Sequence, residues 1–225
     1  MIVENATNNE RAAIEEPEPG TESLPMESGA TLPGRSCDTD ILQRLLADMR
    51  SVDAELVAHG ERTARYSVAL GHALHLFGTD LGQLYLAGLL HDIGKLTLPR
   101  ALLRREAAFS PDEYAVIQCH PRSGAEMLAG IPFLRSAALW IAHHHERWDG
   151  TGYPYGLRDL LIPLGSRILA VTDLFDELAF GSEHSTCPRL AMAVLSRAAG
   201  AQLDPVLVER FSAILCHRSR SREET

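Results

Sequence analysis

Closely spaced cysteine pairs and long apolar runs are missing from this chain of 225 residues. The four cysteines lie far apart and form no C-x-x-C pair, which excludes a disulfide framework and favours a reducing, cytoplasmic location. The longest apolar run, residues 84–90, is too short to span a membrane. The first residues carry neither a basic region nor an apolar core, so we expect no secretory signal.

Basic charge is also scarce, with 21 Lys and Arg against 30 Asp and Glu and a net charge of -9. Domains that bind polymeric nucleic acid usually present a basic face, so we expect no such partner. Residues 1–36 hold seven Glu and only two Arg, mixed with Pro, Gly, Ser and Thr. A segment of this composition cannot bury enough apolar surface to offset the conformational entropy that it would lose on folding. We predict a disordered acidic tail over 1–36, and a second disordered tail over 218–225.

Strand-like alternation is absent, whereas apolar residues recur every three or four positions from residue 36 onward. After a helix that includes Ile41, Leu45 and Met49, the pattern predicts helices at 54–77, 82–92, 110–129, 132–144, 165–180, 188–199 and 204–216. Ser110 and Glu113 have the spacing of a capping box at a helix start. We predict an all-α domain over 37–217 with a Gly- and Pro-rich loop at 146–163.

Histidine is the residue in excess, with ten in the chain. Three of them, His143, His144 and His145, follow one another after an apolar helix. At about 100° per residue they cannot share one solvated face, so some must point inward. A single buried histidine is more often a hydrogen-bonded core residue, but one metal can satisfy several. We therefore expect a metal site, with His143 as the member that does not bind.

Other chemically active side chains stand on separate predicted helices. His91 and Asp92 end an apolar helix, and the Asp92 carboxylate could bridge two cations. Glu55 and His59 lie one turn apart, His120 ends a short helix before Pro121, and Asp173 and Asp176 share a face. A cap or a salt bridge would explain each carboxylate alone. Five histidines and four carboxylates together favour a metal centre.

These motifs resemble those of the HD-GYP family, a branch of the HD superfamily of metal-dependent phosphohydrolases. The similarity covers roughly residues 55–211 and includes H-D-I-G-K from His91 to Lys95, H-H-E-R-W-D-G-T-G-Y-P from His144 to Pro154, and a run that ends at Asp173 and Asp176. The resemblance implies an HD-domain helical bundle with a GYP loop. It also implies a bacterial second-messenger phosphodiesterase that hydrolyses cyclic di-GMP to pGpG or GMP.

The resemblance implies a role for each motif residue. One metal would be held by His59, His91, Asp92 and Asp173, and a second by Asp92, His120, His144 and His145. Glu55 and Asp176 match the acidic positions of members with a third metal, which favours a trinuclear centre over a binuclear one. Asp92 and Lys95 would be the catalytic residues, and Lys95 would contact the scissile phosphate. The substrate-side wall would be formed by Lys95, Gly152, Tyr153 and Pro154.

The expected chemistry follows from this ligand set. Mixed imidazole and carboxylate ligands suit iron or manganese. A hydroxide held between the metals would attack phosphorus, and the metals and Lys95 would stabilise the charge on the phosphate oxygens. The resemblance implies cyclic di-GMP, a dianionic cyclic dinucleotide, as the partner of this site, and signalling proteins as further partners.

One segment departs from the family pattern. Where the family has an Arg-Pro-Tyr-Arg-like run, this chain has S-E-H-S-T-C-P-R over 182–189, with Ser182 and Ser185 at the cationic positions. We expect weaker binding of cyclic di-GMP, or another cyclic dinucleotide as substrate. Arg62 and Arg65 could form a solvated helix face or contact a phosphate, and we favour the solvated face. Two alternatives stay open: a non-catalytic module that binds cyclic dinucleotides or proteins, and a general nucleotide phosphohydrolase.

Overall fold

The structure is a computed structural model that describes residues 35–103, 109–181 and 187–223. The predicted tail over 1–36 lies almost wholly outside this range, as do Ser182, His184 and Ser185. Among the described residues, the regular secondary structure is all helical apart from one isolated bridge between Ala199 and Leu203, and turns and loops connect the helices. The all-α prediction is confirmed. None of the described helices is long and apolar enough to cross a membrane.

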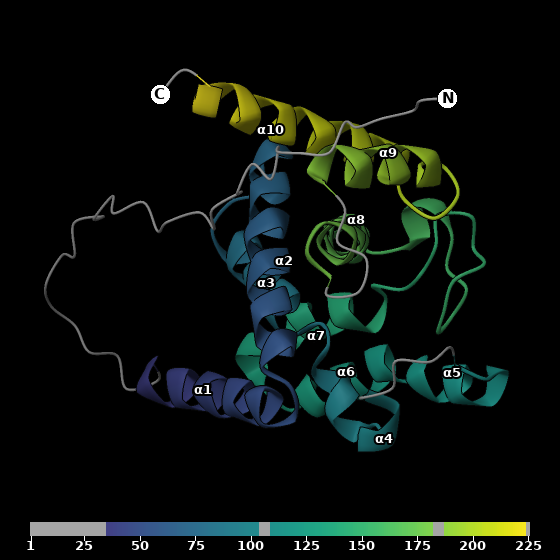
Figure 1. Cartoon of the computed structure of the whole chain (residues 1–225). Helices are drawn as coiled ribbons and strands as arrows, with labels where there is room; N and C mark the ends of the chain where they lie inside the picture. Colours follow the sequence, from purple (N-terminus) through teal and green to yellow (C-terminus); the bar gives the residue numbers. More distant parts are fainter. Residues whose placement is uncertain (1–34, 104–108, 182–186, 224–225) are drawn as a thin grey trace, which may run out of the picture.

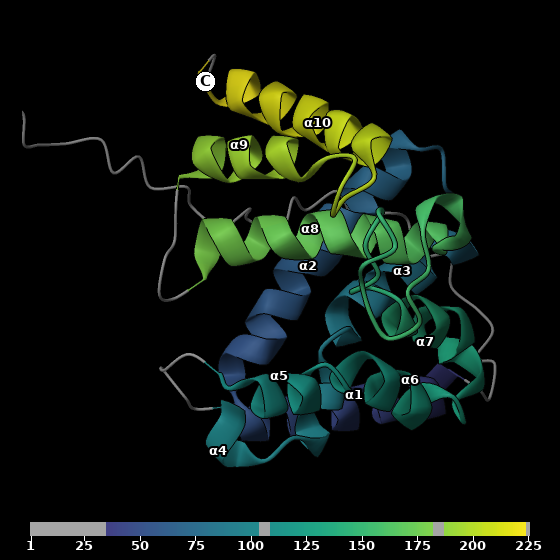
Figure 2. The same ribbon diagram turned by 90° about the vertical axis from the view of Figure 1, so that its right-hand side faces the viewer.

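Two groups of helices lie at opposite ends of the molecule, and α2, α3 and α7 lie between them (Figures 1 and 2). Their bounds are α1 Arg35–Val52, α2 Ala54–Ala73, α3 Thr79–Leu90, α4 Arg100–Leu103, α5 Pro111–Ile117, α6 His120–Leu128, α7 Arg135–Ala142, α8 Leu164–Phe180, α9 Pro188–Ala198 and α10 Pro205–Glu223, with short 3₁₀ turns η1 Ile93–Thr97, η2 Pro132–Leu134 and η3 Asp159–Leu161. Figure 2 shows α8, α9 and α10 as successive layers at one end, while α1, α4, α5 and α6 lie at the other. The predicted domain limits, 37 and 217, stay a prediction.

The segment 110–129 differs from the single helix that its periodicity predicts. The capping box at Ser110 is present, but α5 ends at Ile117 and α6 begins at His120. Pro121 has no N–H, and in a continuous helix its ring would clash with the carbonyl of Ile117. That carbonyl instead accepts a hydrogen bond from His120 Nδ1 at 2.8 Å. His120 therefore begins a helix rather than ending one. The other predicted helices are present with shifted ends.

The hydrophobic core of the described residues consists of two clusters. One contains Leu90 and Ile141 and draws on α1, α2, α3 and α7, and the other contains Phe175 and Phe211 and draws on α8, α9 and α10. Helices α2, α3 and α8 contribute side chains to both clusters. These three helices therefore connect the two clusters.

Two glycines allow the close approaches that the site requires. A Cβ added at Gly88 of α3 would lie 2.6 Å from Ala64 Cα, so α3 can pack directly on α2. A Cβ added at Gly94 of η1 would collide with the His120 carbonyl oxygen and lie 2.6 Å from Gly124 N. A side chain at Gly94 would thus push α6, and His120 with it, away from the end of α3.

Candidate metal centre

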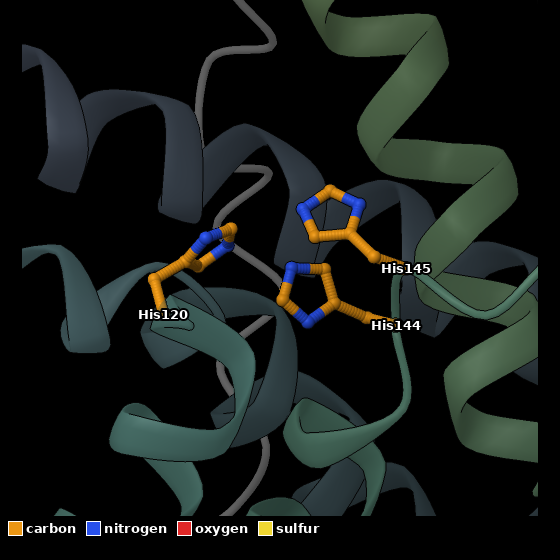
Figure 3. A group of neighbouring side chains, drawn as sticks. All are labelled: His120, His144 and His145. Atoms are coloured by element: carbon orange, nitrogen blue, oxygen red, sulfur yellow. The ribbon is translucent and has the colours of Figure 1, made fainter. Parts of the chain in front are cut away.

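Seven of the nine predicted ligands come together in the structure. Two groups of three form, and in each group the ligand atoms lie within 4.8 Å of one another. The first, which we call the mixed group, contains His59 of α2, His91 after α3 and Asp173 of α8. The second, the imidazole group, contains His120, His144 and His145. Figure 3 shows His144 and His145 on one segment, with His120 facing them from the start of α6.

The mixed group combines two imidazoles with a carboxylate. His59 Nε2 lies 2.9 Å from Asp173 Oδ1 and 3.1 Å from His91 Nε2. His91 Nδ1 donates to the Gly88 carbonyl at 2.8 Å, so its Nε2 faces the group. Burial lowers the pKa of His59, but hydrogen bonds to Asp173 and Asp176 and the nearby negative charges raise it to about 10. Without metal, this group therefore holds protons.

The imidazole group behaves in the opposite way. His120 Nδ1 and His144 Nδ1 each donate to the carbonyl three residues earlier, at 2.8 and 2.7 Å. Burial lowers the pKa of His120, and it lowers that of His144 well below its usual range. Burial also lowers the pKa of His145 to about 4. These three rings are therefore neutral at physiological pH.

Asp92 lies between the two groups and turns one oxygen toward each. Its Oδ1 is 3.4 Å from His120 Nε2, and its Oδ2 is 3.5 Å from His91 Nε2 and 4.0 Å from His59 Nε2. The carboxylate is buried, with a side chain 4% exposed. Burial opposes ionisation, but the charges of Lys95 and the neighbouring histidines hold the pKa of Asp92 well below its usual range. Asp92 therefore has the geometry of a bridge.

Two buried ring nitrogens test whether these residues fit a metal. His120 Nε2 and His144 Nε2 are buried and have no hydrogen-bond partner among the described residues. Because their Nδ1 atoms carry the proton, these Nε2 atoms are acceptors without a donor. A buried acceptor without a partner is costly, and a divalent cation satisfies several imidazoles at once. The donor set therefore fits divalent metal ions.

Lys95 lies at the edge of the centre, on η1. Its Nζ is 2.6 Å from Asp92 Oδ2, and its side chain is 27% exposed. Burial lowers the pKa of Lys95, but the charge of Asp92 outweighs this effect and raises it. Glu177 lies one turn after Asp173, and the negative charge of Asp173 raises the pKa of Glu177 to about 7. Lys95 thus places a fixed positive charge beside the bridging carboxylate.

The loop after the histidines is held by a glutamate that sequence reasoning missed. The buried Glu146 side chain accepts the N–H of Tyr155 at 2.8 Å and of Leu157 at 3.0 Å. Tyr153 N donates to the His145 carbonyl at 3.2 Å, and the two rings lie 5.0 Å apart. Gly152 and Pro154 flank Tyr153, so the predicted wall residues lie next to the imidazole group. The position of Glu146, directly after the histidines and before a Gly-rich loop, was the available signal.

Arg62 corrects the expectation of a solvated face. Its guanidinium bonds Asp176 and Glu55, and its side chain is only 19% exposed. Arg65, in contrast, is exposed and pairs with Glu61 across 3.7 Å. Glu55 and Asp176 are therefore turned toward Arg62 and belong to neither of the two groups. His143, predicted not to bind metal, also lies outside both groups, 3.8 Å from Glu146.

The chain is similar to proteins of known function. The HD domain family matches residues 41–207. A cyclic di-GMP phosphodiesterase of Vibrio cholerae is 34% identical over 76% of this chain and 38% of its own length. The cyclic di-GMP phosphodiesterase response regulator RpfG of Xanthomonas campestris is 34% identical over 76% of this chain and 47% of its own. A 3'3'-cGAMP-specific phosphodiesterase of Vibrio cholerae is 38% identical over 53% of this chain and 28% of its own. This chain thus spans less than half the length of each.

Solved structures share the fold. Bd1817, an HDG"Y"P protein from Bdellovibrio bacteriovorus, superimposes with a TM-score of 0.60 at 23% identity, over 71% of this chain and 52% of that one. The PgpH HD domain of Listeria monocytogenes in complex with cyclic-di-AMP gives 0.57 at 14% identity, over 81% and 98%. At these identities the likeness concerns the fold.

Proposed function

Because the chain belongs to the HD domain family, in its HD-GYP branch, we propose that it is a metal-dependent phosphodiesterase that hydrolyses cyclic di-GMP to pGpG or GMP. The observation that carries this proposal is Asp92, whose two oxygens face two separate groups of ligands. A protein that served only as a scaffold would gain nothing from burying unpartnered nitrogens at His120 and His144. The cyclic di-GMP phosphodiesterases of Vibrio and Xanthomonas support the substrate class.

The residues of the two groups would hold two divalent ions, with Asp92 shared between them. Iron and manganese are the proposed metals, because mixed imidazole and carboxylate donors suit both. When bound, such ions supply Lewis acidity for phosphodiester hydrolysis. The carbonyls that accept from His91, His120 and His144 fix the direction of each Nε2, which is how surrounding groups orient metal ligands.

Lys95 and Tyr153 would position the substrate. The partly exposed Lys95 ammonium carries a positive charge that a bound phosphate can meet without moving the bridging carboxylate. On the other side, Tyr153 lies against His145, and Glu146 holds the following residues by their backbone N–H groups. A dinucleotide would therefore bind between a cation and an aromatic wall, with its phosphate at the two groups.

Another cyclic dinucleotide is the second candidate substrate. One relative is named for 3'3'-cGAMP, and a structural neighbour was solved with cyclic-di-AMP. The serines at 182 and 185, in place of the family's cations, also favour a changed affinity. A binding module without turnover is a further alternative, and it requires the same binding site but gives no metal-dependent product.

The test is hydrolysis by anaerobically purified protein loaded with iron or manganese. Cyclic di-GMP, 3'3'-cGAMP and cyclic di-AMP would be supplied in turn, with linear products followed by chromatography. Asp92→Ala is the negative variant, and Asp80→Ala, which removes an exposed carboxylate at the start of helix α3, is its matched control. We expect metal-dependent product from cyclic di-GMP in wild type and control only. Tight binding without product from any of the three would contradict the proposal.

A further inference from the structure

A guanidinium lies between the two carboxylates for which the family resemblance implies a third metal. Arg62 reaches from α2 to Asp176 of α8 and to Glu55 of its own helix. Its Nε donates to Asp176 Oδ1 at 2.9 Å, and its Nη2 donates to Asp176 Oδ2 at 3.0 Å and to Glu55 Oε1 at 2.7 Å. One organic cation therefore already joins both acids.

Spacing along α2 puts Arg62 in this position. Glu55, His59 and Arg62 follow one another at intervals of four and three residues, so they share one face of the helix. That face is turned toward α8, because His59 Nδ1 lies 2.7 Å from Asp176 Oδ2. The ring of Phe180, also on α8, lies 5.4 Å from Arg62 Cζ and covers the guanidinium. Helix geometry, ion pairs and an aromatic ring all hold Arg62 there.

Asp176 has little capacity left for a metal. Its side chain is only 1% exposed, and Oδ2 accepts both from His59 Nδ1 and from Arg62, while Oδ1 accepts from Arg62 Nε. A carboxylate that accepts the Nδ1 proton of a metal-binding histidine fixes the tautomer and the direction of the ring. Asp176 therefore acts on the orientation of His59, whose Nε2 belongs to the mixed group.

We infer that Arg62 takes the place of a third metal ion in this centre, and that it positions Asp176 against His59. A guanidinium keeps its charge at all accessible pH values, so it does not leave the acids by losing a proton. Paired contacts between Arg and carboxylate are among the strongest hydrogen bonds in proteins, and a metal would have to replace them at both acids. The inference rests on the proposed two-metal centre, and it departs from the trinuclear site that the sequence favours.

Metal counting on the full chain tests this inference without reference to activity. Wild type, Arg62→Gln, Glu55→Gln and the double variant would be reconstituted anaerobically with manganese, desalted and analysed for manganese per chain. Arg65→Gln is the matched control, because Arg65 lies one turn further on α2 and, in the part of the chain that the structure describes, pairs with the partly exposed Glu61 rather than with Glu55 or Asp176. Circular dichroism would verify the helical content of each variant.

We expect about two ions per chain in wild type, Arg65→Gln and Glu55→Gln, each group of ligands holding one ion. Arg62→Gln frees both acids and should rise to about three, and the double variant should return to about two. A wild type with about three ions that falls by one in Glu55→Gln would overturn the inference. So would an Arg62→Gln protein that stays at the wild-type count.

Two further outcomes remain decisive. If Arg62→Gln does not fold, Glu55→Gln alone distinguishes the readings, because an unchanged count supports Arg62 as the partner of Glu55 and a loss of one ion overturns it. A wild type that binds no metal would contradict the proposed function itself. The failure of the inference and the failure of the function are therefore distinguishable.

Discussion

The two halves of the proposed metal centre hold protons in opposite ways. In the mixed group, carboxylates raise the pKa of His59 to about 10, so a metal must displace a proton. In the imidazole group, burial lowers the pKa of His145 to about 4 and leaves the His120 and His144 acceptors unpartnered. The imidazole group thus offers free acceptor nitrogens to a cation. In the mixed group, the negative charge of the carboxylates is already balanced by the proton on His59. Asp92 turns one carboxylate oxygen toward each group.

Removal of the shared carboxylate should cost both groups their metal. In Asp92→Ala both groups lose their common oxygen donor, and we expect neither to retain metal. Two bound cations contribute several kcal/mol to the transition state, so kcat should fall at least about a thousandfold. Metal analysis and a product assay measure the two effects, with Asp80→Ala as the control. Full metal content in Asp92→Ala would remove Asp92 from the bridge.

Single-ligand variants should separate the halves. His144→Ala should cost the metal of the imidazole group, and His91→Ala that of the mixed group, so each should drop from about two ions per chain to about one. The spectroscopic coupling between two manganese ions should vanish in both. His72→Ala, an exposed histidine of α2, is the control. Loss of both ions in each variant would mean that the two groups bind as one unit.

Lys95→Met should leave both groups with their metal ions but lower the rate of hydrolysis. The ammonium contacts Asp92 Oδ2, on the side of the mixed group, and it is the cation proposed to meet the phosphate. Removing one such electrostatic contact typically lowers kcat by about a hundredfold to a thousandfold. Metal content should stay near the wild-type value. If the variant lost metal and activity together, the role of Lys95 would be to hold Asp92 in place and not to contact the phosphate.

Glu146→Gln should disturb the loop beside the imidazole group and leave the mixed group unchanged. The amide oxygen can accept one of the two backbone N–H groups of Tyr155 and Leu157, while the amide NH₂ would face the other. An unsatisfied buried donor costs about 1–3 kcal/mol, so we expect that loss in urea denaturation, with a raised KM because Tyr153 shifts. The mixed group should keep its metal. An unchanged KM would separate the loop from substrate binding.

The opposite proton affinities predict a stability maximum for metal-free protein near the unfolded histidine pKa of about 6.5. Between about pH 6.5 and the folded pKa of about 10, His59 holds a proton that the unfolded chain has lost, so stability falls as pH rises. Between about pH 6.5 and 4, the unfolded chain binds a proton that His145 does not, so stability falls as pH falls.

Urea denaturation in the presence of a chelator measures both limbs. His59→Asn should flatten the alkaline limb relative to wild type, and His145→Asn should flatten the acidic limb. These differences between variants remove the contribution of other titrating groups. If both variants kept the wild-type pH profile, the contrast between the two groups would be wrong.

Much of the site could be predicted because its signals are local. The adjacent pair at His91 and Asp92, the run at 143–145 and the loop that follows are contiguous in the chain, and helical periodicity placed each at a helix end. The break before His120 was missed because apolar spacing continues through 118–119, so only the sterics of Pro121 reveal it.

Long-range pairing could not be predicted in the same way. Arg62 and Asp176 are 114 residues apart, and helical spacing shows only that Arg62 shares a face with Glu55 and His59. Whether that face meets solvent, a metal or a carboxylate depends on how α8 packs on α2. Similarly, the role of Glu146 depends on how the chain folds back over the next 11 residues, at Leu157.

Anomalous diffraction from crystals of the manganese-loaded protein tests the central claim most directly. The account predicts two peaks, one among His59, His91 and Asp173 and one among His120, His144 and His145, with one Asp92 oxygen at each. It predicts no third peak between Glu55 and Asp176, where the Arg62 guanidinium should remain. A single peak, or two peaks that Asp92 does not join, would contradict it.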